Sequence, residues 1–206
     1  MTRPTPWLKS AVFALSLTPL AWLVWQALFG TLGVNPIETV NRFLGDWALR
    51  FLLIALAVTP LRKVTGWVPV ARLRRMLGLF AFFYVCLHLS SYLGLDLFFD
   101  WQALAKDIVK RRYITLGMAA FVLLLPLAAT STDGMIRRLG GRRWRRLHLL
   151  VFPIAVLAVA HYWMMVKADI RQPMLYAVIL AALLGFRVAA ALAGRLRRPR
   201  SGGAAA

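Results

Sequence analysis

Long apolar runs, separated by short charged segments, make up most of the chain. A helix rises about 1.5 Å per residue, so about 20 apolar residues cross the roughly 30 Å hydrocarbon core of a bilayer. We predict six membrane-spanning helices, near residues 10–29, 48–61, 76–95, 113–129, 147–166 and 173–194. The second run is short, and Trp47 and Leu61 are expected to extend it into the interfaces. The first run is longer than the signal-peptide core of about 7–15 residues, so we expect it to be retained as a helix.

Composition supports this fold class, an all-α integral membrane protein with a six-helix bundle. The chain is 61% hydrophobic, yet its formal net charge is +19. Nucleic-acid binding does not explain that charge, because a nucleic-acid binder would not carry such apolar runs. The single cysteine, Cys86, excludes disulfides within the chain and cysteine-based metal centres. We therefore expect one transmembrane domain over residues 10–194, between a cytoplasmic N-terminus (1–9) and a basic, flexible cytoplasmic tail (195–206).

The charged segments predict the orientation. One side of the predicted membrane carries 17 of the 26 Lys and Arg residues and the other side carries 8. Positive charge marks the cytoplasmic side, so both termini are expected to be cytoplasmic. Acidic residues other than Asp133, including Asp46, are assigned to the outer side, and residues 96–106 to a polar, aromatic outer loop. No carboxylate is expected centrally in a helix.

Three histidines, His88, His148 and His161, lie inside the apolar runs. An imidazole in a membrane is costly unless it is paired or coordinated, which makes each a candidate functional residue. His88 lies about 13 residues, and His161 about 15 residues, from the cytoplasmic side of their helices, roughly 20 Å deep in both cases. A bis-histidine haem requires two imidazoles at matched depth, so we predict haem iron between His88 and His161, on the third and fifth helices.

His148 lies near the cytoplasmic face and belongs to a separate, inner position. A second haem there would need a ligand 13 or 14 residues before His88, where Arg75 and Arg74 stand. A guanidinium is a poor iron ligand but binds phosphate well. Two interpretations stay open: an inner site for a phosphorylated cofactor, or a second haem held by His148 alone. On an ideal helix His148 and His161 would point roughly 140° apart, unless Pro153 rewinds the segment.

Three stretches carry a family resemblance: LGLFAFFYVCLHLSSYLGLDL at 77–97, DIVKRRYITLGMAAFVLLLPLAATST at 107–132, and RRLGGRRWRRLHLLVFPIAVLAVAHYWMMVKAD at 137–169. They resemble the MsrQ (YedZ) family, the haem-binding membrane subunits of bacterial MsrPQ systems. That family belongs to the ferric-reductase-like transmembrane group, which includes NADPH oxidases. The resemblance covers essentially all of residues 10–194 and implies a six-helix bundle.

The resemblance also implies a function. Electrons from a cytosolic NAD(P)H-dependent flavin reductase would cross the bacterial inner membrane by FMN and haem b. They would leave to the periplasmic molybdenum enzyme MsrP, which reduces methionine sulfoxide in proteins, so this chain would be an electron conduit and not the catalytic subunit. Flavin phosphate near Arg74 and Arg75, facing Trp144 and His148, would form the inner centre.

Other classes of function remain open from sequence alone. A quinone-linked cytochrome b or a ferric reductase would use the same haem ligands with different redox partners. A transporter or proton channel would use the histidines as a proton relay, although the expected lack of central carboxylates counts against it. A structural membrane subunit without redox activity would be colourless when purified.

Overall fold

The computed structural model describes residues 6–196, and every regular element among them is helical. Six long segments are apolar enough to cross a membrane, which confirms the predicted spans. Their helices are α1 (Pro6–Leu28), α2 (Pro36–Thr65), α3 (Arg74–Ser91), α5 (Arg112–Ala129), α8 (Val151–Met165) and α9 (Arg171–Leu196). Shorter elements connect them: a 3₁₀ turn (Val68–Arg72), a π-helical turn (Tyr92–Asp96), α4 (Trp101–Lys110), α6 (Asp133–Leu139), α7 (Gly141–Leu147) and a second 3₁₀ turn (His148–Leu150). The predicted segments 1–9 and 195–206 lie mostly outside the described residues.

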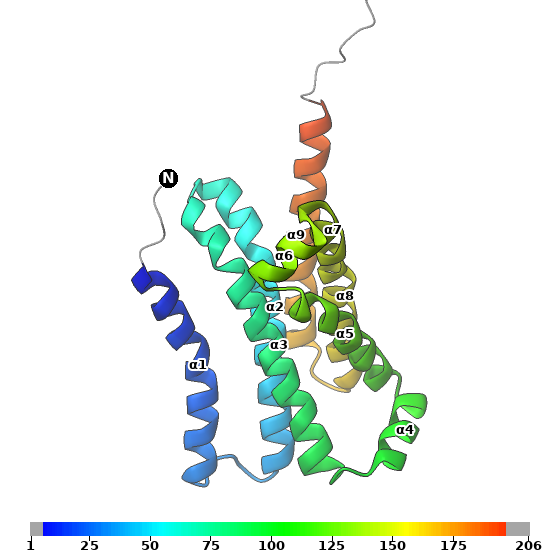
Figure 1. Cartoon of the computed structure of the whole chain (residues 1–206). Helices are drawn as coiled ribbons and strands as arrows, with labels where there is room; N and C mark the ends of the chain where they lie inside the picture. The colour runs from blue at the N-terminus through cyan, green and yellow to red at the C-terminus, as the bar shows by residue number, and fades with distance from the viewer. Residues whose placement is uncertain (1–5, 197–206) are drawn as a thin grey trace, which may run out of the picture.

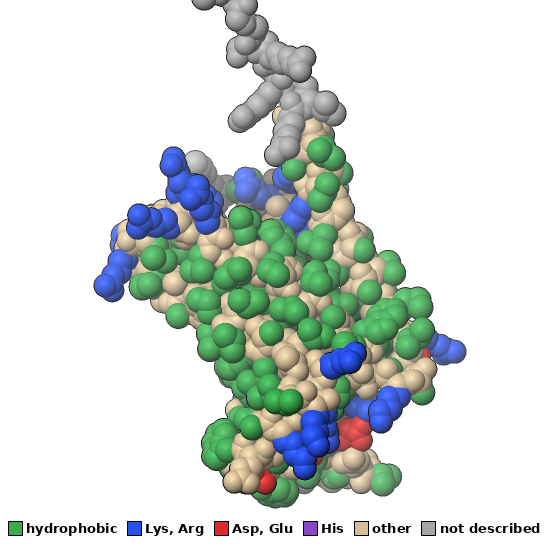
Figure 2. All heavy atoms as spheres, turned by 90° about the vertical axis from the view of Figure 1, so that its right-hand side faces the viewer, with side chains coloured by type: hydrophobic (Ala, Val, Ile, Leu, Met, Phe, Trp, Pro, Cys, Tyr) green, Lys and Arg blue, Asp and Glu red, His purple; other side chains and the backbone are tan. Residues whose placement is uncertain are grey.

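The two ends of the bundle differ in structure and charge. Figure 1 shows α6, α7 and the end of α9 at one end, and α4 with the α1–α2 connection at the other. Figure 2 shows a broad hydrophobic band on one face, with Lys and Arg side chains toward the upper end and mixed basic and acidic side chains toward the lower end. An apolar belt between charged ends is the surface expected of a membrane-spanning bundle.

Helix α2 begins 12 residues before the predicted start, which corrects the range 48–61. Its start has ordinary helix signals: Asn35 caps the Glu38 amide, and a proline occupies the first helical position. Charged residues then recur every four residues as the ion pairs Glu38–Arg42 and Asp46–Arg50. These charged residues precede the apolar run, so apolar length alone put the start of the helix at residue 48, although the helix begins at Pro36. The added three turns carry part of the site described below.

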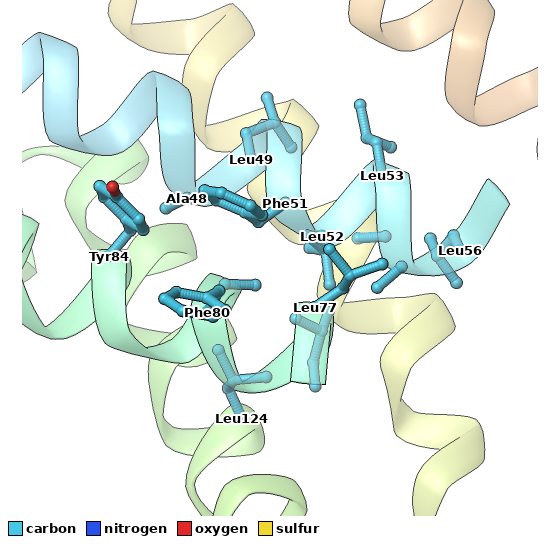
Figure 3. Close-up of a cluster of buried hydrophobic side chains, with 14 of the residues drawn as sticks. Ala48, Leu49, Phe51, Leu52, Leu53, Leu56, Leu77, Phe80, Tyr84 and Leu124 are labelled. Atoms are coloured by element: carbon cyan, nitrogen blue, oxygen red, sulfur yellow. The ribbon is translucent and has the colours of Figure 1, made fainter. Parts of the chain in front are cut away.

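The core lies where α2 packs along α3 and where α5 packs along α8. Figure 3 shows Phe51 of α2 over Phe80 and Tyr84 of α3, surrounded by leucines from both helices and Leu124 of α5. The Phe51 ring centroid lies 5.7 Å from that of Phe80 and 5.2 Å from that of Tyr84. Two helix pairs, α2–α3 and α5–α8, therefore form the frame of the bundle.

Helix α1 is attached to this frame by a buried tyrosine. The hydroxyl of Tyr84 donates to the Ser16 carbonyl at 2.9 Å and accepts from the Leu20 amide at 3.2 Å. In an uninterrupted helix that amide would bond to that carbonyl directly, so the hydroxyl is inserted into the hydrogen-bond ladder of α1. The insertion lies beside Pro19, where the ladder already lacks a donor.

The fifth span is not one continuous α-helix. Helix α7 ends at Leu147, a 3₁₀ turn covers His148–Leu150, and α8 begins at Val151. Angles calculated for an ideal helix therefore do not relate His148 to His161. The predicted loop 96–106 is also corrected, because most of it belongs to α4, which Asp100 caps through the amides of Gln102 and Ala103.

Candidate functional site

His88 and His161 face each other across the interior of the bundle. His88 extends from α3 and His161 from α8, and their ring centroids lie 6.3 Å apart with planes inclined at 76°. Both side chains line one cavity of about 540 Å³ between α2, α3, α5 and α8. The structure thus brings together the two histidines that depth alone had matched.

Each ring is fixed by a hydrogen bond to a backbone carbonyl of a neighbouring helix. His88 Nδ1 lies 2.9 Å from the Asn41 oxygen in α2, and His161 Nδ1 lies 2.6 Å from the Tyr113 oxygen in α5. A carbonyl oxygen only accepts, so Nδ1 carries the hydrogen in both rings and Nε2 is the unprotonated nitrogen. This arrangement is typical of metal-ligating histidines, whose second nitrogen donates to a carbonyl or carboxylate.

The spacing of the rings suits one metal ion between them. Two metal–imidazole bonds of about 2 Å each, together with the ring radii, would place the centroids about 6 Å apart, close to the observed distance. Residues 6–196 contain no cluster of three or more His, Cys, Asp or Glu side chains arranged to hold a metal. A metal bound by these two histidines would take its remaining ligands from outside this residue set, which a macrocycle supplies in haem.

The cavity is mainly apolar inside and polar at its outer mouth. Its volume falls within the range of about 300–1,000 Å³ typical of sites for organic ligands. At the mouth, Arg42 pairs with Glu38 and Arg111 pairs with Asp107. The hydrogen bond from Arg111 to the Tyr113 hydroxyl raises the pKa of Arg111, and the ion pair with Asp107 acts in the same direction.

A polar network borders the cavity and corrects the placement of Asp46. This residue lies within α2 and not in an outer loop, and its carboxylate interacts with Tyr162 and, at 3.8 Å, with Arg50. Arg50 Nε also donates to the Tyr176 hydroxyl at 2.9 Å. The network joins α2, α8 and α9 and holds the residue that follows His161. Asp46 thus lies inside α2, in the N-terminal half of this helix and not at its centre.

Comparison with known proteins gives the family. A family described as "Ferric reductase like transmembrane component" matches residues 44–159. The protein-methionine-sulfoxide reductase heme-binding subunit MsrQ of Rhodospirillum rubrum is 59% identical over 194 residues, which is 94% of this chain and 91% of the relative. Proteins of the same name from Caulobacter vibrioides (54%; 82% of this chain, 81% of the relative) and Xanthomonas euvesicatoria (53%; 91% and 88%) are also similar. The chain belongs to the MsrQ family.

In this MsrQ-family chain the inner residues form a second group around His148. The His148 ring stacks on Trp144 with centroids 3.9 Å apart, and its Nδ1 lies 3.1 Å from the Trp144 carbonyl. Trp144 Nε1 in turn donates to the Thr130 carbonyl at 2.9 Å. His148 Nε2 is buried close to the Leu127 backbone, but the two groups are not aligned for a hydrogen bond. None of these residues lines the cavity between His88 and His161.

The two arginines predicted at the inner position have different surroundings. Arg74 interacts electrostatically with His148. Arg75 instead forms an ion pair with Asp133 at the start of α6, and this partner lowers the pKa of the carboxyl. The charge of Arg74 therefore acts on His148, whereas Arg75 is paired with Asp133.

One inner residue was missed in the sequence. Arg187 of α9 donates to the carbonyls of Leu56 in α2 and Leu183 in α9, and its guanidinium lies 5.4 Å from the Phe152 ring centroid. The guanidinium of Arg187 is also repelled by the like charge of Arg74. The sequence did mark this residue. Of the 26 Lys and Arg residues, 17 are assigned to the cytoplasmic side and 8 to the outer side, and Arg187, inside the last span, is the one that remains.

Proposed function

We propose that this chain binds b-type haem through His88 and His161 and conducts electrons across a membrane. The observation that carries the proposal is the facing pair of imidazoles, 6.3 Å apart, each with Nδ1 bound to a carbonyl and Nε2 left to bind iron. The names of the relatives, which describe haem-binding subunits, support it. When bound, haem with two histidine ligands supplies one-electron transfer in preference to oxygen binding.

Absorption spectra of the purified protein, oxidised and dithionite-reduced, test the ligand pair. His88→Ala and His161→Ala are expected to lose or strongly alter the b-type bands, because each removes one axial nitrogen. Gly185→Ala in α9 is the control, since an added methyl there meets nothing within 4 Å, and His148→Ala tests separately whether a second haem is held at the inner position. Unchanged bands in either of the first two variants would exclude the proposed pair.

The proposed electron path runs from a cytosolic NAD(P)H-dependent flavin reductase to a periplasmic MsrP-type molybdenum enzyme that reduces methionine sulfoxide in proteins. Two facts support it: the relatives are named as subunits of a methionine sulfoxide reductase, and His88 and His161 lie in the last turns of α3 and α8, with α3 leading through the π-helical turn to α4. This chain would be the conduit, with the substrate chemistry on its partner. In vesicles, NADH and flavin reductase should reduce the haem, and MsrP with a sulfoxide should reoxidise it. Failure of both steps would refute the path.

We also propose that FMN occupies the inner position, with its phosphate near Arg74 and its ring system near Trp144 and His148. The support is a cation, an aromatic ring and an imidazole gathered at the cytoplasmic end of the bundle. Arg74→Glu is expected to lower the flavin content of purified protein. Arg75→Glu is the matched control, because this neighbour pairs with Asp133. Equal flavin content in both variants would remove Arg74 from the site.

The proposed location is the bacterial inner membrane, with both termini in the cytoplasm. Helices α6 and α7, which lie at one end of the bundle in Figure 1, carry six arginines, whereas α4 at the other end carries two lysines. Positive charge favours the cytoplasmic side. The same orientation puts His88 and His161 nearer the periplasm and His148 nearer the cytosol.

A further inference from the structure

Each facing imidazole lies directly on a glycine of a neighbouring helix. A methyl group added at Gly45 of α2 would lie 3.1 Å from both Cε1 and Nδ1 of His88. One added at Gly117 of α5 would lie 2.9 Å from His161 Nδ1 and 3.0 Å from Cε1. These distances are shorter than an ordinary carbon–carbon contact of about 3.5–4.0 Å. Any other residue at either position would displace the imidazole or the helix.

The two contacts share one register. Asn41, which accepts from His88, stands four residues before Gly45, and Tyr113, which accepts from His161, stands four residues before Gly117. The histidine follows its carbonyl partner by 47 residues in the first case and 48 in the second. The helix pairs α2–α3 and α5–α8 thus use the same arrangement to hold a ring.

Helix geometry explains this register. Side chains on an α-helix tilt toward its N-terminus, so a residue covers the turn that precedes its own Cα. A glycine leaves the carbonyl four residues earlier uncovered, and that oxygen has a second lone pair beyond its helical hydrogen bond. An imidazole from the next helix can then reach it only if the glycine has no side chain. Neither glycine adopts a positive φ, so backbone conformation does not require glycine at these positions.

We propose that Gly45 and Gly117 are positioning residues for the haem ligands. By admitting each ring onto its carbonyl, they set the 6.3 Å separation and the 76° angle between the imidazole planes. This inference rests on the proposed haem ligation by His88 and His161. It adds that ligand geometry depends on two residues that do not touch the iron.

Alanine substitution separates positioning from general stability, because alanine favours a helix more than glycine does. Gly78→Ala in α3 and Gly185→Ala in α9 are matched controls, since nothing lies within 4 Å of an added methyl at either position. The controls should keep the haem content, midpoint potential and electron paramagnetic resonance spectrum of the wild type. Gly117→Ala should lower haem affinity about 10- to 100-fold, as loss of outer-sphere support does. Gly45→Ala should have the smaller effect, because its contact is longer.

The resonance spectrum of the ferric protein is the decisive readout, since its low-field feature reports the angle between the two ligand planes. A shift of that feature, or a high-spin signal, in Gly117→Ala but not in Gly185→Ala supports the proposal. Wild-type spectra and haem content in both Gly45→Ala and Gly117→Ala would overturn it. Should His161→Ala retain unaltered haem bands, the proposed ligation itself fails and this inference fails with it.

Thermal unfolding of the haem-free protein tests the contact between Gly117 and the His161 ring without the cofactor. Gly117→Ala is expected to lower the thermal unfolding midpoint when His161 is present. In a His161→Ala background, where the ring is gone, the same change should raise the midpoint as Gly185→Ala does. An equal effect of Gly117→Ala in the two backgrounds would show that the glycine does not hold the ring, and the proposal would be wrong.

Discussion

The hydrogen bond from Arg187 to α2 gives the most quantitative prediction. Pro60 has no amide hydrogen, so the buried carbonyl of Leu56, four residues earlier, lacks its helical donor. Arg187 supplies that donor from α9 while it also bonds to Leu183 and lies over Phe152. Arg187→Met should therefore destabilise the bundle by about 1–3 kcal/mol, the cost of an unsatisfied buried acceptor.

A double-mutant cycle isolates this bond. In a Pro60→Ala background the new amide can satisfy the carbonyl, so Arg187→Met should cost less by about 1–1.7 kcal/mol. This coupling lies at the upper end of values for hydrogen bonds in membranes, where the average is about 0.6 and the maximum about 1.7 kcal/mol. The upper end applies because the carbonyl has no other donor in its own helix. Losses of the contact with Phe152 occur in both backgrounds and cancel.

Reversible unfolding in mixed micelles, followed by tryptophan fluorescence, measures the four free energies. Pro126→Ala with Arg187→Met is the matched control cycle, because Pro126 lies in α5 and has no contact with the guanidinium among the hydrogen bonds described. That cycle should be additive within about 0.5 kcal/mol. A coupling below the same limit in the Pro60 cycle would refute the explanation given for Arg187.

Three further predictions follow from other parts of the molecule. Tyr84→Phe removes the hydroxyl inserted between Ser16 and Leu20 and should lower the free energy of unfolding by about 1–2 kcal/mol; an unchanged value in the same assay would contradict the insertion. Because Arg75 lowers the pKa of Asp133, their ion pair adds stability above the ordinary carboxyl pKa of about 4 and loses it as the pH falls through the lowered value. The difference in Tm between wild type and Asp133→Asn should thus be greatest near neutral pH and close in acid, whereas a gap independent of pH would count against the pair. Alkaline phosphatase fused at the C-terminus should be inactive in intact bacteria, and an active fusion would reverse the proposed orientation.

The spans and the histidine pair could be predicted because each depends on a signal along the chain. Apolar length identified six helices, and the charge imbalance gave depths that matched His88 with His161. Helix α2 was predicted too short because the rule used was apolar length, whereas its first turns are held by ion pairs such as Glu38–Arg42. Asn35 and the proline after it were readable signals for the true start.

Contacts between helices were not predictable in the same way. Gly45 and Gly117 have meaning only once a ring from another helix lies on them, and one sequence gives no account of which faces meet. Arg187 was detectable as a cation inside the last span, and Pro60 shows that the Leu56 carbonyl lacks a helical donor. That the two groups meet depends on how α9 packs against α2. Such pairings depend on the azimuth of each helix, which hydropathy does not fix.

The geometry of the histidines also bears on the proton-relay alternative that the sequence left open. A relay imidazole must accept a proton on one nitrogen and release another from the second. In His88 and His161 the second nitrogen donates to the backbone carbonyls of Asn41 and Tyr113, and an amide oxygen is too weak a base to take that proton on. Asp46 lies within a span and borders the cavity, but its carboxylate already interacts with Arg50 and Tyr162. Among residues 6–196, this network contains no second carboxylate to which a proton could pass. The bond that blocks a relay fixes the tautomer and orientation of a metal-binding imidazole, so the same two hydrogen bonds disfavour proton transport and favour haem ligation.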